Sequence, residues 1–412
     1  METVPPPDTT RFYLAMILNL IKHTSISYDK AYKIITRRYG LRGWLAPLLY
    51  KLGYYFINYY YTLRWLSAKN GYGKQPGGIA AYFASIGFSY KRALRLIRDE
   101  VRNLSRTKRI SLLYSYPEYL VKDLLNHMDE SELEKMLRSL NTRKRWLRIN
   151  TLKTTIEDAL ECLDSEGVVY RDTDLEYMVY VEHPKWTPIS RLKCYRVGHV
   201  VPQDYSSALV VEAFGRIKGK LLDACSAPGM KLSLIHMLNP EIISFGVDYS
   251  AKRIEAARRL LGLLGVDPSK TILVNGDSTL LGYSRVFNYA LIDAPCSGLG
   301  AVYGDPAVKI SAGRKSKLEY YHGKQLMLLR NTARHAEHIV YATCSIHPLE
   351  GELVVSKLVD EGLLEPMEPG IKLDKAYRGV PGGDYTYRVY PHRSNSQGFY
   401  IAVLKSRVAG KA

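Results

Sequence analysis

The sequence predicts an α/β fold in the C-terminal half of the chain, built on a parallel, doubly wound sheet. Three observations carry this prediction. Short apolar runs recur from about residue 199, helical stretches separate them, and acidic or small residues follow their ends. Strands that alternate with helices are typical of βαβ units and a parallel sheet. The five expected strands are Lys220–Leu222, Ile243–Val247, Thr271–Val274, Tyr289–Ile292 and His338–Tyr341.

Helices are expected between these strands, and a hairpin is expected after them. Ala251–Gly262 and Lys317–Arg334 have the length and composition of helices. Near the end, Thr386–Tyr390 and Phe399–Lys405 have strand composition and flank a turn-rich segment. We therefore expect residues 199–412 to form one domain whose sheet ends in an antiparallel hairpin.

The segment 108–198 predicts a small α+β module. A basic run, Arg143–Asn150 (RKRWLRIN), lies near its middle and is expected to be a strand. Three helices and two further strands are expected, at 117–127, 131–140 and 156–163, and at 168–170 and 177–181.

Residues 1–107 are expected to form an all-helical domain. Apolar residues between Phe12 and Ile21 recur at helical spacing, and glycines punctuate the later pieces. Between 91 and 109, eight basic residues stand against Asp99 and Glu100. Such runs are usually solvated helix faces, but this density exceeds what solubility needs and favours a nucleic-acid-binding face.

The whole chain is strongly basic. It has 58 Lys and Arg against 40 Asp and Glu, a formal charge of +18. Such an excess favours a polyanionic partner, and nucleic acid is the usual one. The acidic, proline-rich start does not resemble a signal peptide. The most apolar stretch, Leu45–Leu66, contains Lys51 and Arg64, so we expect a buried helix rather than a membrane span.

The cysteines show no metal-binding or disulfide pattern. There are five, with no CxxC pair and no zinc spacing. An odd number without a framework favours a reducing compartment. We therefore expect a cytoplasmic protein without a metal site.

The segment Asp223–Lys231 (DACSAPGMK) has the features of a cofactor loop. It follows the first expected strand of the sheet, and Gly229 lets the backbone approach a ligand at a helix N-terminus. It is not the GxGxxG fingerprint. Asp248 and Asp277 follow the second and third strands, where acids can bind a ribose or a base edge. One such acid is more often a helix cap, but three point to a nucleoside-type cofactor.

Two further strand ends carry cysteines, in Asp293–Gly298 (DAPCSG) and Tyr341–Ile346 (YATCSI). Cysteines that only pack usually lie inside apolar runs, whereas these lie just past the strands, where a thiol can react. A thiolate can add to carbon 6 of cytosine, so that carbon 5 attacks the methyl group of S-adenosylmethionine. A second cysteine can assist elimination. Asp293, at least partly protonated through burial, can stabilise the adduct at N3.

These segments resemble the Sun (NSUN/RsmB-like) family of RNA cytosine-5 methyltransferases, over roughly residues 110–405. The resemblance implies a Rossmann-like class I methyltransferase sheet, S-adenosylmethionine as cofactor, RNA as partner, and a small RNA-binding domain at 108–198. The matching motifs are Asp223–Lys231, Asp293–Gly300, Thr343–Ser345 with Pro348 and Glu350, Arg148–Lys153, Gln203–Ser207, Tyr390–Arg393 and Gly398–Ala402.

The resemblance also implies roles that the chemistry alone leaves open. Cys344 is the nucleophile, and Cys296 helps to release the product. Lys231 and Asp293 contact the target cytosine. The cofactor is held by Cys225, Ser226, Ala227, Pro228, Gly229, Lys231, Asp248, Arg253, Asp277 and Asp293.

The chain departs from the family pattern at a few positions. Met230 stands where glycine is common, Leu232 where threonine is usual, and Gly351 where asparagine lies between Glu350 and Glu352. The helical N-terminal domain is similar to the NusB-like domain of bacterial small-subunit rRNA methyltransferases, and we expect it to bind RNA or a partner. No C-terminal PUA domain is expected, which slightly favours rRNA over tRNA as the substrate.

Three alternatives stay open. The chain could be a tRNA cytosine-5 methyltransferase, or a non-catalytic RNA-binding or ribosome-assembly factor on the same fold. Binding alone needs no thiol pair, which argues against the second. It could also be a DNA cytosine methyltransferase, but those enzymes place the nucleophile in the Pro-Cys segment and need no cysteine like Cys344.

Overall fold

The computed structural model describes residues 7–284 and 286–410. They form two compact units, which we call the helical unit and the sheet unit. The helical unit consists of residues up to Thr142 together with Ser297–Lys317, and the sheet unit consists of Arg143–Cys296 and the chain from Leu318 onward. The three domains expected at 1–107, 108–198 and 199–412 stay a prediction.

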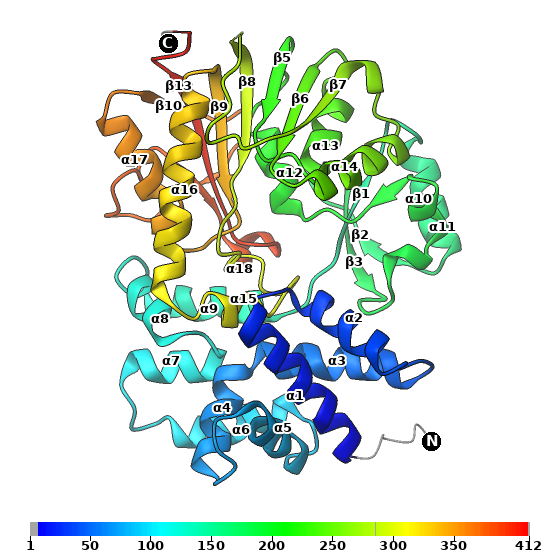
Figure 1. The fold of residues 1–412 in the computed structure, drawn as a ribbon, viewed down its shortest axis with the longest axis vertical. Coiled ribbons are helices and arrows are strands. Elements are labelled where there is room, and N and C mark those ends of the chain that lie inside the picture. Colours follow the sequence, from blue (N-terminus) through cyan, green and yellow to red (C-terminus); the bar gives the residue numbers. More distant parts are fainter. Residues whose placement is uncertain (1–6, 285, 411–412) are drawn as a thin grey trace. The chain divides into compact units, whose positions relative to one another are not determined.

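The helical unit is built from helices (Figure 1), and buried apolar side chains form its core. Leu14, Ile17, Leu18 and Ile21 are at most 1% exposed, as their spacing predicts. Its helices are α1 (Pro7–Thr24), α2 (Tyr28–Arg38), α3 (Leu45–Asn58), α4 (Tyr60–Lys69), α5 (Pro76–Ser85), α6 (Tyr90–Glu100), α7 (Arg106–Tyr114), α8 (Glu118–Leu124), α9 (Glu130–Asn141) and α15 (Val308–Ser311). No helix among the described residues is long and apolar enough to cross a membrane.

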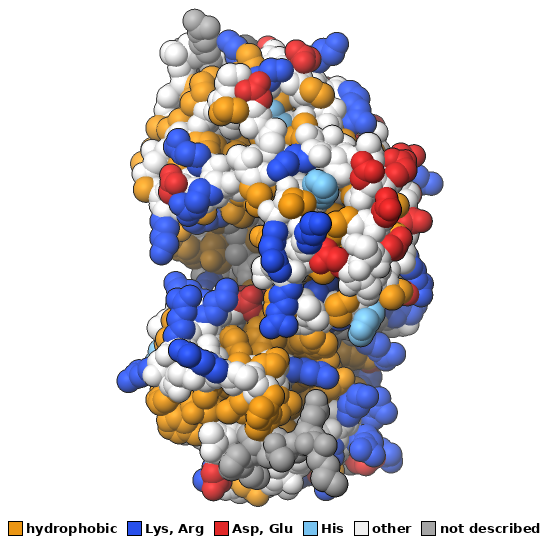
Figure 2. Space-filling model, turned by 90° about the vertical axis from the view of Figure 1, so that its right-hand side faces the viewer, with side chains coloured by type: hydrophobic (Ala, Val, Ile, Leu, Met, Phe, Trp, Pro, Cys, Tyr) orange, Lys and Arg blue, Asp and Glu red, His pale blue; other side chains and the backbone are white. Residues whose placement is uncertain are grey.

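The surface of the helical unit is rich in Lys and Arg, with few acidic side chains between them in the view of Figure 2. Only part of the basic run at 91–109 lacks ion pairs with acidic side chains. Its second half is neutralised by ion pairs, Arg102 with Asp99, Lys108 with Glu118, and both Arg106 and Arg109 with Glu130. The sequence could not show this, because Glu118 and Glu130 lie in later helices.

The segment Ser297–Lys317 joins the helical unit directly after Cys296. It is anchored by Lys309, which is fully buried. The Lys309 Nζ donates to the Asn58 carbonyl at 2.8 Å and to Asn141 Oδ1 at 2.6 Å, and lies 4.0 Å from the ring centre of Tyr116. Burial lowers the pKa of Lys309 well below its ordinary value.

The sheet unit begins with a small antiparallel sheet in the order β2-β3-β1-β4. Its strands are β1 (Trp146–Ile149), β2 (Val169–Arg171), β3 (Met178–His183) and β4 (Val200–Val201), and its helices are α10 (Ile156–Ser165) and α11 (Lys193–Arg196). The basic run at 143–150 points partly inward. Lys144 and Arg148 are at most 6% exposed, so these two cations are not free to bind RNA.

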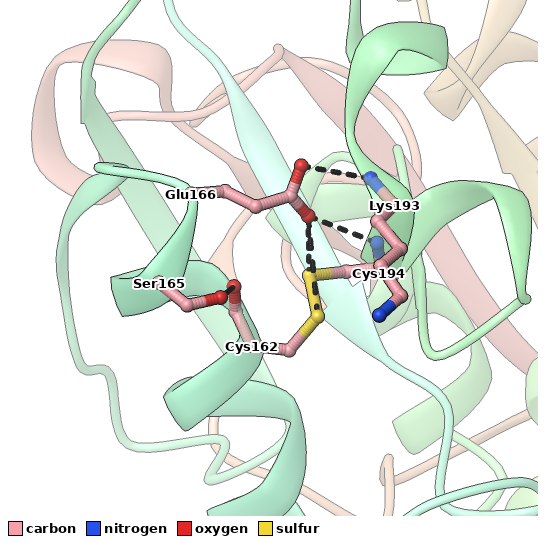
Figure 3. The surroundings of a disulfide bond; sticks show 5 residues. All are labelled: Cys162, Ser165, Glu166, Lys193 and Cys194. Atoms are coloured by element: carbon pink, nitrogen blue, oxygen red, sulfur yellow. Dashed lines mark hydrogen bonds between the residues drawn. A yellow bond between two sulfur atoms is a disulfide. The ribbon is translucent and has the colours of Figure 1, made fainter.

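A disulfide joins Cys162 of α10 to Cys194, at the start of α11 (Figure 3). The expectation of a chain without paired cysteines is therefore wrong. The two residues are 32 apart in sequence, and only the packing of α10 on α11 brings their Cα atoms to 6.1 Å. Glu166 accepts hydrogen bonds from the backbone N–H groups of Lys193 and Cys194 at 2.8 and 3.0 Å.

The larger sheet has the order β11-β12-β13-β9-β8-β5-β6-β7, and β10 pairs with β13. Strands β7, β6, β5, β8 and β9 are parallel, and the others are antiparallel. The strands are β5 (Lys220–Asp223), β6 (Ile243–Asp248), β7 (Thr271–Asn275), β8 (Phe287–Asp293), β9 (Ala336–Thr343), β10 (Leu364–Met367), β11 (Asp374–Lys375), β12 (Tyr387–Val389) and β13 (Phe399–Ser406). All five parallel strands predicted from the sequence are confirmed, as is the antiparallel pairing of the last two.

Helices flank this sheet, with α13 and α14 on one side of the strands and α16 and α17 on the other (Figure 1). They are α12 (Tyr205–Glu212), α13 (Met230–Leu238), α14 (Ala251–Leu263), α16 (Lys315–Ala333), α17 (Glu352–Asp360) and α18 (Pro391–Ser394). The strand order reverses between β5 and β8, because β5 pairs with β6 on one side and with β8 on the other. Ligands of such sheets bind beyond the carboxyl ends of the strands at this reversal.

Candidate active site

The parallel strands bring the predicted motifs to one edge of the sheet. Asp223 ends β5, Asp248 ends β6 and Asp293 ends β8. Strands β8 and β9 are adjacent and parallel, with Asp293 in register with Ala342. The segments that follow these strands, though up to 120 residues apart in sequence, therefore begin side by side.

Two cysteines that form no disulfide meet at this edge. Cys296 follows β8, Cys344 follows β9, and their sulfur atoms lie 3.3 Å apart. Both side chains are half-buried, and neither forms a disulfide. The structure thus places the two predicted cysteines next to each other, close enough to act on neighbouring atoms of one substrate.

An acid and a base lie beside the thiol segments. Lys231, in the first turn of α13, donates from Nζ to Asp293 Oδ2 at 2.5 Å. The Lys231 side chain is 10% exposed and that of Asp293 34% exposed, so the carboxyl group stays accessible. The ammonium also lies 5.1 Å from the ring centre of Phe399, on β13. The pair can accept and donate a proton at the accessible carboxyl group of Asp293.

The loop after β5 is tightly packed. Asp223 is buried and accepts a hydrogen bond from the backbone of Cys225 at 3.2 Å. Burial raises the pKa of Asp223 to about 7 and raises the pKa of the Cys225 thiol well above its ordinary value. Cys225 is thus a poor nucleophile compared with an exposed thiol. Gly229 has φ of +100°, and a Cβ there would lie 3.3 Å from Leu261.

Two arginines support this loop from different elements. Arg253, on α14, pairs with Asp248 Oδ2 at 2.9 Å and also donates to the Ala227 carbonyl. Arg148, on β1 of the small sheet, is fully buried and donates to Ser233 Oγ at 2.7 Å in α13. The role of Arg148 could not be seen in the sequence, because its partner lies 85 residues away.

Asp277 has a local role in the structure. Its Oδ1 accepts from the Thr279 backbone N–H at 2.9 Å and from the Thr279 hydroxyl at 2.7 Å. These hydrogen bonds lower its pKa. The geometry is that of a turn-capping acid, and its predicted contact with a cofactor stays a prediction.

The structure adds residues that sequence reasoning missed. Tyr249 follows Asp248 and is 75% exposed, although it is aromatic. Gln325 of α16 donates to the Pro295 carbonyl at 2.9 Å, beside Cys296. Arg388 of β12 donates to the Ser345 carbonyl at 2.8 Å, beside Cys344. The sequence shows that an aromatic residue, Tyr249, follows Asp248. The contacts of Gln325 and Arg388 join residues far apart in the sequence, so no local sequence pattern predicts them.

One cluster outside this edge has the residue types and the spacing of a metal site. Among the residues that the structure describes, Cys162, Glu166 and Cys194 are the only group of this kind. Its two sulfur atoms are bonded to each other (Figure 3).

Two regions of the chain match known families. Residues 216–405 match the family described as 16S rRNA methyltransferase RsmB/F, and residues 116–186 match the RsmF/B-like ferredoxin-like domain. The human 28S rRNA (cytosine(4447)-C(5))-methyltransferase is 33% identical over 338 residues, which cover 75% of this chain and 40% of that protein. The 25S rRNA (cytosine-C(5))-methyltransferase nop2 of Schizosaccharomyces pombe is 30% identical over 317 residues, covering 72% and 52%.

The chain therefore spans about half, or less, of the length of these two relatives. The solved structure of PH0851 is similar to the whole described fold, with a TM-score of 0.76 and 19% identity. The match covers 98% of this chain and 100% of that one.

Proposed function

The chain belongs to the Sun family of methyltransferases, of the RsmB/F type, and on this premise we propose that it methylates carbon 5 of a cytosine in structured RNA. The observation that carries the proposal is the 3.3 Å separation of the Cys296 and Cys344 sulfur atoms, which form no disulfide, at adjacent strand ends. We prefer rRNA to tRNA as the substrate class, because the named relatives act on rRNA.

In the proposed reaction the Cys344 thiolate adds to carbon 6 of the cytosine, and N3 takes up a proton. S-adenosylmethionine, when bound, would supply the methyl group: its bond from sulfur to that methyl would break as carbon 5 bonds to it, and S-adenosylhomocysteine would leave. Cys296 then removes the proton from carbon 5. N3 returns its proton to Asp293 as the bond between carbon 6 and Cys344 breaks, which restores the aromatic ring and the Cys344 thiolate.

Lys231 and Asp293 are proposed to serve the cytosine ring. The adduct needs a proton at N3, and the Lys231–Asp293 pair holds one between two groups 2.5 Å apart. Because Asp293 is the more exposed partner, we assign it the direct contact with N3. Lys231 then orients the carboxyl group and replaces the proton that it gives.

The loop after β5 fits an S-adenosylmethionine-type cofactor. Ser226 Oγ is buried and has no hydrogen-bond partner among the described residues, so a ligand could satisfy it. Gly229, with its positive φ, lets the backbone of the helix start approach a ligand. Asp248 ends the second strand, where a ribose is bound in such folds, and the exposed Tyr249 offers a ring for stacking. The remaining predicted contacts, at Cys225, Ala227, Pro228, Arg253 and Asp277, belong to this proposal.

RNA binding is assigned mainly to the helical unit. That unit contains 26 Lys and Arg against 12 Asp and Glu, whereas the sheet unit contains 32 against 28. The helical unit thus carries +14 of the total of +18. Exposed cations that form no ion pair with any described residue lie on two of its helices. They are Lys30, Lys33 and Arg37 on α2, and Lys91, Arg92, Arg95 and Arg98 on α6.

Two alternatives are weaker. A non-catalytic RNA-binding or ribosome-assembly factor would have no use for two adjacent thiols beside an acid–base pair. A DNA methyltransferase would not need a cysteine after β9. A cytoplasmic location goes with the proposal, because the substrate is cellular RNA and because the nucleophile must stay a reduced thiol.

The test is methyl transfer by the purified full chain. The protein is incubated with methyl-labelled S-adenosylmethionine and with rRNA, tRNA or DNA in separate reactions, and labelled RNA is then sequenced after bisulfite treatment. We expect a protected cytosine in rRNA, lost in Cys344→Ser.

Each other outcome selects a different reading. Label in tRNA alone keeps the enzyme and changes the substrate, and label in DNA alone contradicts the RNA assignment. No label in any of them, with RNA bound and S-adenosylmethionine bound, favours the non-catalytic factor.

A further inference from the structure

We propose that Arg388 and Glu352 form a buried positioning pair that fixes the backbone beside the Cys344 thiol. This rests on the proposed function, since it assigns the pair to that nucleophile. Arg388 lies on β12 and Glu352 begins α17, and neither belongs to the cysteine segments. Arg388 Nη1 donates to the carbonyl of Ser345, the residue after Cys344, at 2.8 Å.

The orientation of Arg388 is fixed by a two-pronged ion pair. Its Nε and Nη2 atoms donate to the two carboxylate oxygens of Glu352 at 2.7 and 2.6 Å. The two side chains are 2% and 0% exposed. Such a fork holds the guanidinium plane in one orientation, which a lysine ammonium cannot do. The third donor nitrogen is therefore aimed at the Ser345 carbonyl.

Two aromatic rings also hold the guanidinium in place. Its carbon lies 4.2 Å from the ring centre of Tyr377 and 5.4 Å from that of Tyr400, and both rings are fully buried. Tyr377 also donates from its hydroxyl to the Ile346 carbonyl at 2.8 Å. The two carbonyls that follow Cys344 are thus bound by Arg388 and by the ring that packs on it.

A second brace comes from Glu350. The Ser345 hydroxyl donates to Glu350 Oε2 at 2.5 Å, and the Thr343 hydroxyl donates to the Glu350 carbonyl at 3.1 Å. The residues on both sides of Cys344 are therefore fully buried and hydrogen-bonded, whereas Cys344 itself is half-buried. A reactive side chain on a backbone that is fixed in this way can adopt few conformations, and such restriction favours an efficient nucleophile.

Gly351 is part of this arrangement. A Cβ at position 351 would lie 2.7 Å from the ring of Tyr400 and 3.2 Å from Arg388 Nη2. The family resemblance places an asparagine here, so in this chain the ring of Tyr400 takes the space of that side chain. Gly351 therefore gives a way to disturb Arg388 without removing a buried charge.

The test compares Arg388→Lys with Arg330→Lys. Arg330 also pairs with a glutamate, since its Nη2 donates to both carboxylate oxygens of Glu361, but this pair lies on a half-exposed surface of the same unit. Two quantities are measured. The kinetics of methyl transfer are measured with Cys296 intact. The pH profile of Cys344 alkylation by iodoacetamide is measured in a Cys296→Ala background. Mass spectrometry assigns the label to Cys344.

We expect Arg388→Lys to lower kcat by about 10- to 100-fold, with KM for RNA within about twofold, and to shift the alkylation profile of Cys344. Arg330→Lys should change neither. If Arg388→Lys does not fold, Gly351→Ala is expected to give the same pattern in a milder form.

An unchanged kcat and alkylation profile in a folded Arg388→Lys, or in Gly351→Ala, would overturn the proposal. Alkylation needs neither RNA nor S-adenosylmethionine. If the wild-type protein transfers no methyl group, but Arg388→Lys shifts the alkylation profile of Cys344, the result would count against the proposed function and for the positioning pair.

Discussion

The helical unit and the sheet unit use buried charge in different ways. In the helical unit the fully buried Lys309 is held by uncharged oxygens and a ring, and the free cations lie on the surface. In the sheet unit, Arg148 is also held by an uncharged group, the Ser233 hydroxyl, but Arg388 and Asp248 are each paired with an opposite charge. This difference fits the proposals that the helical unit binds a polyanion and that paired charges in the sheet unit fix reactive groups.

The largest effect on stability is expected at the anchor of the helical unit. Lys309→Ala leaves a cavity and three buried oxygens without their donor, so we expect the free energy of unfolding of this unit to fall by about 3–5 kcal/mol. Hydrogen exchange followed by mass spectrometry, read separately on peptides of each unit, measures it. Faster exchange in the larger sheet but not in the helices would contradict this placement.

The disulfide of the small sheet should come next. Cys162→Ser removes a cross-link that closes a loop of 32 residues, and loops of this size contribute about 2–4 kcal/mol. Urea unfolding of the variant, compared with that of Cys225→Ser, measures the loss. Thiol titration of the unfolded wild-type protein should find three free thiols, and five would show that the disulfide is absent.

The buried acid of the sheet unit gives a pH test. The pKa of Asp223 is raised to about 7 in the folded state, above its unfolded value of about 4. The folded state then binds more protons between these values, so this carboxyl group lowers stability as pH rises from about 4 to about 7. Asp223→Asn should therefore be more stable than wild type above about pH 7, with the difference gone below about pH 4.

Unfolding by urea over a pH series measures that difference. A constant difference at all pH values would mean that the carboxyl group keeps its ordinary pKa in the folded protein.

The smallest expected effect is on RNA affinity. Each unpaired cation of α2 that contacts a phosphate should contribute about 0.7–0.9 to the slope of log affinity against log salt. Lys30→Ala and Lys33→Ala together should lower that slope by about 1.5. Arg106→Ala with Arg109→Ala, which removes cations that are already paired with Glu130, is the matched control. An equal decrease of the slope in both double variants would show that the unpaired cations contribute no more to RNA binding than the paired ones.

Local sequence patterns predicted the parts of the molecule that depend on neighbours in the chain. The alternation of strands and helices placed β5 to β9, and the segments after β8 and β9 identified Cys296 and Cys344. The orientation of Lys144 and Arg148 toward the interior could not be predicted, because a basic run has the same composition whether it faces water or not.

Contacts between residues that are far apart in the sequence were also missed. The Cys162–Cys194 disulfide spans 32 residues and the Arg388–Glu352 pair spans 36. Neither leaves a pattern in the sequence, because the fold alone brings these residues together.

The central claim is that Cys344 attacks the base and Cys296 releases it. The most direct measurement is denaturing gel electrophoresis and mass spectrometry of Cys296→Ala after incubation with substrate RNA and S-adenosylmethionine. We predict a covalent complex of protein and RNA, attached through Cys344 and absent when both cysteines are replaced. A complex that forms in Cys344→Ala with Cys296 intact, or the absence of any complex from Cys296→Ala under conditions in which the wild type methylates RNA, would contradict the claim.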